Sequence, residues 1–329
     1  MLKKFINKLL KTRVSRLIPD GFFLKIKFWI NYGKKLNLKN PHTYNEKIQW
    51  LKINDRKMYY SNLVDKYEVK KYVSSLIGEK YIIPTIGVYE NWDEINFNLL
   101  PNQFVIKCTH DSGGMIVCRN KDSLNLKEAK KKINKSMKRN YYWLSREWPY
   151  KNVKPRIIVE KYLDFHNNYT SNVEFDSNYI STEQLQRENG LLDYKFMCFN
   201  GKVEYLFLDI GVIGKGIGHS EDYYRNVYDS NFNIQPFLET RKNYPTRIEK
   251  PKNFEKMVEI AEKLSKNFKH IRVDLYNVDG KIYFGELTFY HGGGLTNKFI
   301  PESYNDVFGD LIQLKKWNRM NLERRILWK

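Results

Sequence analysis

Two segments near the C-terminus, residues 271–277 and 281–290, predict the strands of a β-hairpin. The first carries Arg272 and Asp274, the second carries Glu286 and Thr288, and a short turn that contains glycine joins them. Successive side chains of a strand point to opposite faces, so each of these two pairs shares a face of its strand. Whether both pairs lie on the same side of the hairpin depends on the turn.

A two-residue turn pairs Val278 with Lys281 and places Asp274 opposite Gly285. Glu286 then points away from Asp274. In that register the acidic residues do not form a cluster.

A three-residue turn that ends in Gly280 instead pairs Asn277 with Lys281, and Arg272 then faces Glu286. All the polar groups converge on one side in this register. Clustered carboxylates suit Mg²⁺, which takes a few carboxylates together with phosphate oxygens and water. The alternative is an ordinary Arg–Glu cross-strand pair on a solvated sheet face.

A second signal is a strand, residues 103–108, that carries Lys107 and leads into a glycine-containing loop at 110–114. A strand lysine supplies positive charge and a glycine loop supplies backbone N–H groups, so together they suit the phosphates of a nucleotide. The chain has neither the P-loop nor the Rossmann glycine pattern. A third signal is the strand 156–162, which ends in a polar pair and is interpreted as a hinge beside an adenine edge or as a strand that reaches the surface.

Composition limits the classes of protein that remain. The 57 Lys and Arg exceed the 37 Asp and Glu and give a net charge of +20, which favours nucleic acid, phosphorylated substrates or an anionic membrane as a partner, unless the lysines merely cover solvated faces. Aromatic residues make up 15% of the chain and exclude intrinsic disorder. Three cysteines cannot form a disulfide framework, so a reducing compartment, the cytoplasm, is expected.

No apolar run reaches the roughly 20 residues of a membrane-spanning helix. The basic aromatic segment 21–35 is predicted to be a helix packed on the protein, with contact to an anionic membrane surface as the alternative. Tyrosines and arginines at 139–146 are assigned to packing between subdomains rather than to base stacking. The glycines at 214–218 predict a mobile loop with a role at the substrate as the alternative, and those at 292–294 are expected to allow close approach of a ligand.

The order of predicted elements is helices first and then a mixed α+β body. Helices are expected at 44–53, 61–77, 126–140 and 253–268, and a hairpin at 194–199 and 203–209. Pro84 and residues 90–94 are assigned to loop or linker, and 166–189 to a long excursion with a short helix. We therefore divide the chain into a helical N-terminal region, 1–100, a small lobe with the glycine loop, 101–163, and a large lobe with the metal and substrate site, 164–329.

The three signals occur in an order that resembles ATP-grasp enzymes, and Asp65-Lys66 resembles the phosphate-binding Asp-Lys of D-alanine–D-alanine ligases. Longer motifs at 40–50, 63–67, 145–150, 193–196 and 272–276 are similar to the TupA-like ATP-grasp family of polysaccharide biosynthesis. The resemblance covers about residues 40–310 and implies two α+β lobes that hold ATP between them. The helical front replaces the α/β domain that usually precedes these lobes, so the resemblance does not identify the acceptor.

Roles for individual residues follow from this resemblance. It implies phosphate contacts from Lys66, Lys107 and the loop residues Ser112, Gly113 and Gly114, and an adenine pocket lined by Glu160, Lys161 and Leu163. It implies one or two Mg²⁺ ions on Asp274 and Glu286, with Thr288 where most relatives have asparagine, which favours a single ion. Arg272 would stabilise an acyl phosphate, and Lys195 would face the phosphates or the substrate.

The implied activity is ATP-dependent ligation of a carboxylate to an amine in cell-surface polysaccharide biosynthesis. The expected partners are an amine donor and an anionic glycan, nucleotide-sugar or lipid-linked acceptor at the cytoplasmic membrane face, without nucleic acid. A kinase or glycosyltransferase of the same pathway is the first alternative. A basic nucleic-acid-binding protein is the second, and it leaves Arg272, Asp274 and Glu286 without a purpose.

Overall fold

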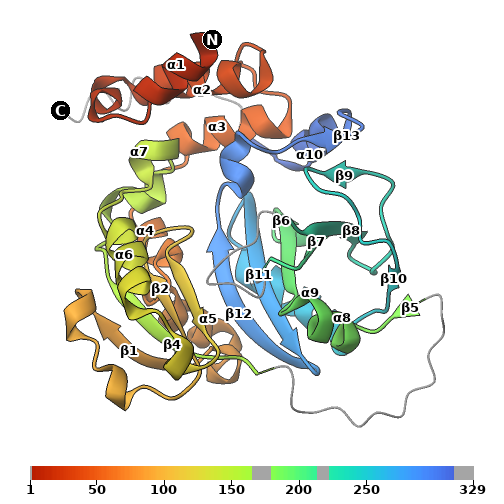
Figure 1. Ribbon diagram of the computed structural model, residues 1–329. Helices are drawn as coiled ribbons and strands as arrows, with labels where there is room; N and C mark the ends of the chain where they lie inside the picture. Colours follow the sequence, from red (N-terminus) through yellow and green to blue (C-terminus); the bar gives the residue numbers. More distant parts are fainter. Residues whose placement is uncertain (1, 165–178, 213–221, 315–329) are drawn as a thin grey trace.

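Helices dominate the first 80 residues, as the apolar spacing predicts. In the computed structural model, which describes residues 2–164, 179–212 and 222–314, these helices are α1 (Leu2–Leu9), α2 (Asp20–Tyr32), α3 (Tyr44–Asn54), α4 (Tyr60–Val64) and α5 (Glu68–Ile77). Helices α1 and α2 form a layer at the top of Figure 1, with α3 beneath them. Phe23, Leu24 and Phe28 of α2 are buried, which confirms that segment 21–35 packs on the protein.

The single helix predicted at 61–77 is wrong, because the chain breaks between α4 and α5. Asp65 causes the break: its Oδ1 accepts hydrogen bonds from the backbone N–H groups of Tyr67 and Glu68 at 2.8 and 3.1 Å. An aspartate that bonds to nearby backbone in this way competes with a continuing helix and starts a new one. The break places Lys66 between two helices instead of on the side of one.

The small lobe is built on a four-stranded antiparallel sheet in the order β1-β4-β2-β3. Its strands are β1 (Thr85–Tyr89), β2 (Phe104–Cys108), β3 (Met115–Cys118) and β4 (Ile157–Lys161), and α6 (Leu126–Met137) packs on it. Strand β1, between the loop residues predicted at 84 and 90–94, was not predicted. Pro84 and Gly87 weaken the strand signal there, and both are tolerated because β1 is an edge strand with an irregular register at Gly87.

The large lobe contains a five-stranded antiparallel sheet in the order β12-β11-β6-β7-β8. Its strands are β6 (Asp193–Phe199), β7 (Lys202–Ile210), β8 (Tyr224–Asp229), β11 (His270–Val278) and β12 (Lys281–Thr288). Helix α9 (Phe254–Ser265) packs on one face, and the other face turns toward the small lobe in Figure 1. The predicted hairpins are confirmed, whereas β8 was not predicted.

Short elements complete the chain. They are α7 (Tyr142–Ser145), α8 (Thr182–Asn189), α10 (Tyr304–Leu311), the strand pairs β5 (Tyr179–Ile180) with β10 (Arg247–Ile248) and β9 (Leu238–Glu239) with β13 (Phe299–Ile300), and 3-10 helices such as η1 (Arg13–Leu17), η2 (Glu79–Tyr81), η6 (Trp148–Asn152) and η7 (His291–Gly294). The predicted glycine loop at 214–218 and the first part of the excursion at 166–189 lie outside the described residues. In the described ranges, no helix has the length and apolar character needed to cross a bilayer.

The aromatic and basic stretch 139–146 packs between subdomains, as predicted. Arg146 is fully buried, and its Nε lies 3.0 Å from Oδ1 of Asp20 on α2. The hydroxyl of Tyr142 donates to the same carboxylate at 2.8 Å. These contacts attach the N-terminal layer to the rest of the protein.

The core of the large lobe contains a histidine that folds in its neutral form. His270 is buried, with Nδ1 2.9 Å from the carbonyl oxygen of Cys198 and Nε2 3.0 Å from the hydroxyl of Tyr44. Nδ1 therefore carries the proton that the carbonyl accepts, and Nε2 accepts from Tyr44. Burial lowers the pKa of His270 to about 3.

Acid is therefore expected to destabilise the protein through His270. A histidine whose folded pKa lies below its unfolded value contributes stability above the unfolded pKa of about 6.5 and loses it as the pH falls toward about 3. At pH 5 the loss amounts to about 2 kcal/mol. Urea unfolding at pH 7.5 and 5.0 measures this effect. Between the two pH values, the free energy of unfolding of His270→Gln should fall by about 2 kcal/mol less than that of the wild type. Equal losses in both proteins would contradict the assignment.

Candidate active site

The register of the hairpin β11–β12 combines features of both predicted alternatives. The turn has two residues, Asp279 and Gly280, with φ of 51° and 79°, and it pairs Val278 with Lys281. A register shift then occurs beyond Leu275, which pairs with Phe284, so that Asp274 lies opposite Glu286. Gly285 is the extra residue of this β-bulge.

The bulge brings the two carboxylates to one face of the sheet. Without the bulge, a two-residue turn would place Asp274 opposite Gly285. A Cβ on Gly285 would lie 3.0 Å from the carbonyl oxygen of Asp274, so a residue without a side chain suits this close approach. The predicted convergence of polar groups is confirmed, although the three-residue turn proposed for it is wrong.

Arg272 joins the two carboxylates. Its Nε and Nη2 donate to the two oxygens of Asp274 at 2.6 and 2.7 Å, and Nη2 also donates to Oε1 of Glu286 at 2.8 Å. Nη1 donates to Nδ1 of His291 at 2.8 Å. A guanidinium has five N–H groups, so these contacts with described residues leave one for a ligand.

Lys195 lies on β6 beside this cluster, paired in register with Asp274. Its Nζ is 3.4 Å from Oδ2 of Asp274 and 3.7 Å from Oδ2 of Asp209, and it contacts Asp193 directly. Burial opposes the charge on this amine, but Asp193, Asp274 and Asp209 together raise the pKa of Lys195 above its ordinary value. The ammonium is therefore fixed as a charged group in the sheet face.

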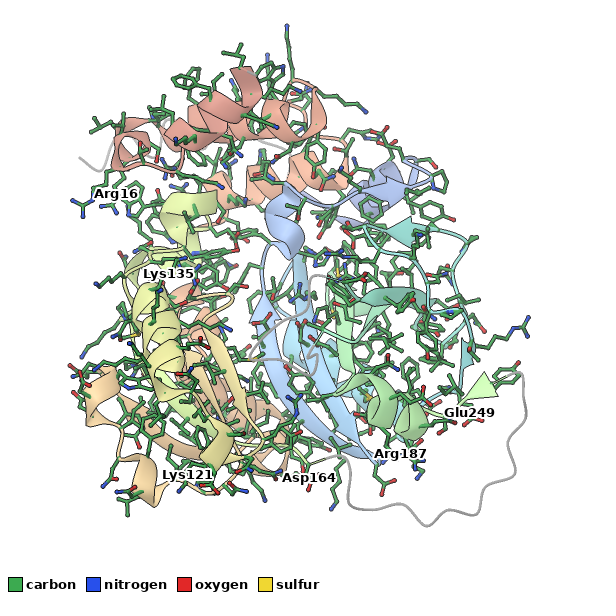
Figure 2. All side chains as sticks on the ribbon, in the orientation of Figure 1. Arg16, Lys121, Lys135, Asp164, Arg187 and Glu249 are labelled. Carbon is green, nitrogen blue, oxygen red and sulfur yellow. The ribbon has the colours of Figure 1, made fainter. Side chains whose placement is uncertain are left out.

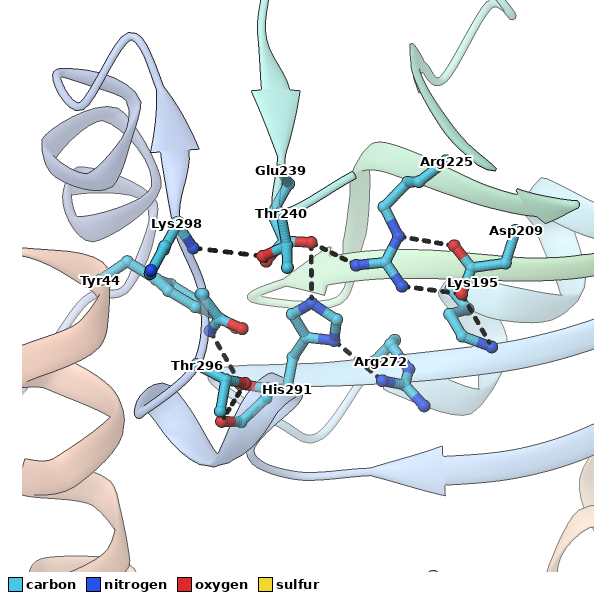
Figure 3. A network of polar contacts seen from close by, with 12 residues as sticks. Tyr44, Lys195, Asp209, Arg225, Glu239, Thr240, Arg272, His291, Thr296 and Lys298 are labelled. Atoms are coloured by element: carbon cyan, nitrogen blue, oxygen red, sulfur yellow. Dashed lines mark hydrogen bonds and ion pairs between the residues drawn. The ribbon is translucent and has the colours of Figure 1, made fainter. Parts of the chain in front are cut away.

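The network continues across the sheet to Arg225 on β8 (Figure 3). Arg225 donates from Nε and Nη2 to the two oxygens of Asp209 at 2.5 and 2.7 Å and from Nη1 to Glu239. His291 lies between the two arginines, with Nε2 3.7 Å from Oε2 of Glu239. Because its Nδ1 accepts from Arg272, the imidazole is neutral with its proton on Nε2. Burial lowers the pKa of His291 to about 4.

The two carboxylates of the hairpin are perturbed in opposite directions. Burial raises the pKa of Asp274 to about 6, even though Arg272 and Lys195 act to lower it. Burial would also raise the pKa of Glu286, but Lys66, Arg272 and Lys195 lower it to about 2. The pKa of Asp274 is therefore raised and that of Glu286 lowered, because burial outweighs the neighbouring cations at Asp274 and not at Glu286.

The glycine loop and Lys66 face this cluster from the other side. Nζ of Lys66 donates to the carbonyl oxygen of Asp111 at 2.7 Å. Gly113 has a φ of 109°, and a Cβ on Gly114 would lie 2.6 Å from Oγ of Ser136. Gly113 is thus favoured by its backbone conformation and Gly114 by the lack of space beside Ser136, and both line the cavity together with Lys66.

Lys107 and Glu160 meet on the inner face of the small-lobe sheet. Nζ of Lys107 lies 2.7 Å from Oε2 of Glu160, and Lys70 of α5 contacts the other oxygen. Burial would raise the pKa of this carboxyl, but Lys107 and Lys70 hold it below its ordinary value. Lys70 was not predicted from the sequence, because nothing in a helical lysine indicates a buried partner.

A cavity of about 540 Å³ lies between these groups. The predicted residues that line it are Lys66, Lys107, Ser112, Gly113, Gly114, Lys195, Arg272, Asp274 and Glu286. The predicted adenine residues Glu160, Lys161 and Leu163 line a second, smaller cavity with Val105, Val117, Tyr162 and Leu191. Lys107, Met115 and Tyr276 line both cavities. The smaller, mostly apolar cavity thus adjoins the larger, charged one, an arrangement that suits a nucleotide base and its phosphates.

The donor set at Asp274 and Glu286 fits Mg²⁺. Both are carboxylates on neighbouring strands that line the same cavity, and oxygen is the ligand that Mg²⁺ prefers. Within the described ranges, no cluster of three or more histidine, cysteine or acidic side chains could hold a metal alone. A pair of carboxylates suits an ion that completes its coordination with substrate phosphates and water.

Two other predicted features differ in detail. Thr288 does not line the cavity; its hydroxyl donates to Oε1 of Glu286 at 3.2 Å. The glycines at 292–294 have φ between 57° and 60°, and a Cβ at Gly294 would lie 2.5 Å from Nε2 of Gln49. The expectation that these glycines allow close approach of a ligand is wrong for Gly294, because the side chains of Gln49 and Ile48 fill the space beside it. Of the three glycines, Gly292 lines the cavity.

Many of the residues that line the cavity were not predicted as site residues from the sequence. They include Asp111, Asp193, Asp209, Tyr223, Arg225, Glu239, Thr240, Arg241, His291, Thr296 and Asn297. For Asp209 a signal existed, because it directly follows the apolar run 205–208, whereas Asp193 shares its strand with Lys195. Arg225 lies in the unpredicted strand β8, and Glu239 belongs to the two-residue strand β9, so periodicity gave no signal for either.

Two α+β lobes with lysines and a glycine loop facing paired carboxylates define the class of ATP-grasp enzymes. The chain belongs to the TupA-like ATP-grasp family: the model of this family, described as TupA-like ATPgrasp, matches residues 46–175 and 178–313. The predicted family and α+β ATP-grasp fold are thereby confirmed, and so is the predicted enzyme class, an ATP-grasp ligase. No curated protein sequence matches this chain.

Solved structures show a more distant similarity. The D-alanine–D-alanine ligase of Bacillus anthracis complexed with ATP is 12% identical, with a TM-score of 0.38, over 82% of this chain and 68% of that one. The D-alanine–D-alanine ligase of Helicobacter pylori is 14% identical, with a TM-score of 0.41, over 84% and 68%. These scores are too low to carry an argument, so the assignment rests on the family match.

Proposed function

We propose that the protein is an ATP-dependent carboxylate–amine ligase that works through an acyl phosphate in cell-surface polysaccharide biosynthesis. Its acid substrate would be a uronic acid or similar carboxylate on an anionic glycan, nucleotide-sugar or lipid-linked saccharide. The observation that carries the proposal is the shape of the main cavity. It extends from the phosphate side, at Lys66 and Lys107, past Asp274 to a second polar region.

The second polar region suits an acidic saccharide. Its wall includes Tyr223, Thr240, Arg241, Thr296 and Asn297. The guanidinium of Arg241 lies over the ring of Tyr223, with its carbon 4.5 Å from the ring centre. Its Nε is buried and has no hydrogen-bond partner among the described residues. An arginine held against an aromatic ring, with an unused donor, matches a carboxylate, and the hydroxyl and amide groups match sugar hydroxyls.

The reaction needs positioning and charge stabilisation more than a covalent nucleophile. An oxygen of the substrate carboxylate attacks the γ-phosphorus of ATP, the bond to the β,γ-bridging oxygen breaks, and ADP leaves. The amine nitrogen then attacks the carbonyl carbon of the acyl phosphate, phosphate leaves, and the nitrogen loses a proton. Each step concentrates negative charge on phosphate oxygens, where fixed cations lower the barrier.

The chain supplies such cations from both lobes. Lys66 and Lys107 would hold the ATP phosphates, and the free N–H of Arg272 would contact the acyl phosphate. Mg²⁺ bound by Asp274 and Glu286 would neutralise phosphate charge during transfer. Lys195 would offset part of the negative charge of Asp193, Asp209 and Asp274 beside the phosphates.

The proposed setting is the cytoplasmic side of the membrane. A net charge of +20 attracts an anionic glycan or a lipid-linked saccharide. The main cavity, by contrast, mixes acidic and basic groups and has the size of a small-molecule site. A saccharide substrate with one carboxylate uses both features, which is why we favour it over nucleic acid.

Trapping with hydroxylamine tests the proposed chemistry. The full-length protein with ATP, Mg²⁺ and a panel of uronic acids is expected to release ADP and to convert the matching acid into a hydroxamate. Hydroxylamine replaces the natural amine, so the amine need not be known. ADP release without hydroxamate would assign a kinase that phosphorylates an alcohol, and turnover of a nucleotide-sugar without ATP would assign a glycosyltransferase.

A further inference from the structure

The outer surface of the N-terminal layer exposes large apolar side chains. Leu2, Phe5, Leu17 and Phe22 are 64%, 68%, 86% and 60% exposed. Leu9 and Val14, in the same stretch of chain, are exposed as well. We call these six residues the apolar tips. An exposed apolar patch of this kind in a folded protein usually marks a surface of interaction.

The layer does not need these side chains for its own packing. Leu10, Phe23, Leu24 and Phe28 are buried and form the core beneath it. In α1, Leu2, Phe5 and Leu9 are spaced by three and four residues and lie on one side, away from that core. Arg16, beside Leu17, projects outward at the edge of the layer in Figure 2. The apolar tips are therefore a second, outward-facing set.

The same surface is strongly basic. Residues 1–35 contain ten Lys and Arg and one acidic residue, Asp20. Asp20 is already used inside the protein, by Arg56, Arg146 and Tyr142. Lys34 contacts Glu302, but the exposed Lys4, Lys8 and Lys11 place positive charge beside the apolar tips with no ion-pair partner among the described residues.

We propose that this face binds the surface of an anionic lipid bilayer. Leucine and phenylalanine tips enter the boundary between headgroups and acyl chains, while the lysine and arginine heads contact lipid phosphates. This pattern of apolar tips among basic residues is what interfacial helices use. The inference is independent of the proposed reaction, because it rests on a surface outside the cavity.

Other occupants fit this face less well. A nucleic acid would meet the positive charge but would leave Leu2, Phe5 and Leu17 in water. A second copy of the chain would bring its own net charge of +20 against the same basic face. Residues 315–329 contain six Lys and Arg and one Glu, so they too would meet like charge.

Vesicle flotation tests the proposal. The full-length protein is expected to float with phosphatidylglycerol vesicles at 0.1 M salt and to stay unbound with phosphatidylcholine vesicles. Replacing Lys4, Lys8 and Lys11 together with glutamate should weaken binding by at least about 100-fold. Each basic residue near an anionic surface contributes about fivefold in affinity, so the loss of three accounts for about 100-fold, and the repulsion of the new glutamates adds to it.

A matched variant controls for total charge. Lys71, Lys80 and Lys281 are exposed, and their elements, α5, η2 and the start of β12, lie at the end of the molecule opposite the N-terminal layer (Figure 1). Their replacement by glutamate changes the net charge equally. This variant should float like the wild type. Equal loss in both variants would show only a response to overall charge and would overturn the proposal.

Apolar variants separate a bilayer from other anions. Phe5→Ser with Leu17→Ser should weaken flotation about tenfold without lowering thermal stability, since both side chains are exposed. The control is Leu99→Ser with Ile234→Ser, two exposed apolar side chains elsewhere, which should bind normally. Unchanged binding of the first variant would assign the face to a soluble polyanion. A dimer that this variant dissociates would assign it to a second copy.

Discussion

Replacing Asp274 with asparagine is expected to remove the Mg²⁺ dependence of ATP binding and to leave the protein folded. The affinity for ATP in the presence of Mg²⁺ should fall at least about tenfold, or ~1.4 kcal/mol, and ADP release about 1000-fold, because the metal stabilises charge on the transferred phosphoryl group. Calorimetric titration of ATP with and without Mg²⁺ measures the first effect directly.

The fold should tolerate this substitution for a specific reason. Burial raises the pKa of Asp274 to about 6, so the folded state gains no stability from the charge of this carboxylate. An asparagine has the same shape without the charge, and Arg272 keeps its contacts with Glu286 and His291. Glu204→Gln, on β7 outside the cavity, is the control and should bind ATP normally. Wild-type Mg²⁺ dependence in Asp274→Asn would exclude Asp274 from the metal site.

The sequence predicted the chemistry of this site better than its geometry. The polar side chains at 272, 274, 286 and 288 could be assigned to strand faces, because strand periodicity determines which of them share a face. The bulge at Gly285 could not be read, because an inserted residue has no signature apart from the glycine itself. The two-residue turn alone would have separated the carboxylates.

The part of the cavity wall around Asp209, Arg225 and Glu239 was harder to predict for a different reason. Its charged side chains come from β6, β7, β8, β9 and η7, which are far apart along the chain. Asp209 and Glu239 become partners only through Arg225, on a strand that the sequence did not reveal. Pairings of this kind are decided by tertiary packing, which local patterns do not encode.

Loss of Arg225 is expected to destabilise the protein more than loss of any exposed charge. Arg225 is buried and binds both oxygens of Asp209 and one of Glu239. Arg225→Met would leave Glu239 without its arginine and Asp209 with Lys195, 3.7 Å away, as its remaining cation among the described residues. Breaking a buried ion pair in this way costs about 3–5 kcal/mol. Urea unfolding at pH 7 measures the loss. Lys202→Met, which removes an exposed ion pair with Glu262, should cost less than about 1 kcal/mol.

The pH dependence of Arg225→Met identifies the cause of the loss. Without the arginine, burial should raise the pKa values of Asp209 and Glu239 in the folded state above their unfolded values. Groups shifted in this direction add stability at low pH and lose it as the pH rises through the folded pKa. The deficit relative to the wild type should therefore shrink from pH 7 to pH 5, and the triple variant Arg225→Met, Asp209→Asn, Glu239→Gln should show no such recovery. A deficit that stays constant with pH would mean that Arg225 stabilises by packing over Phe207 and not by compensating the two carboxylates.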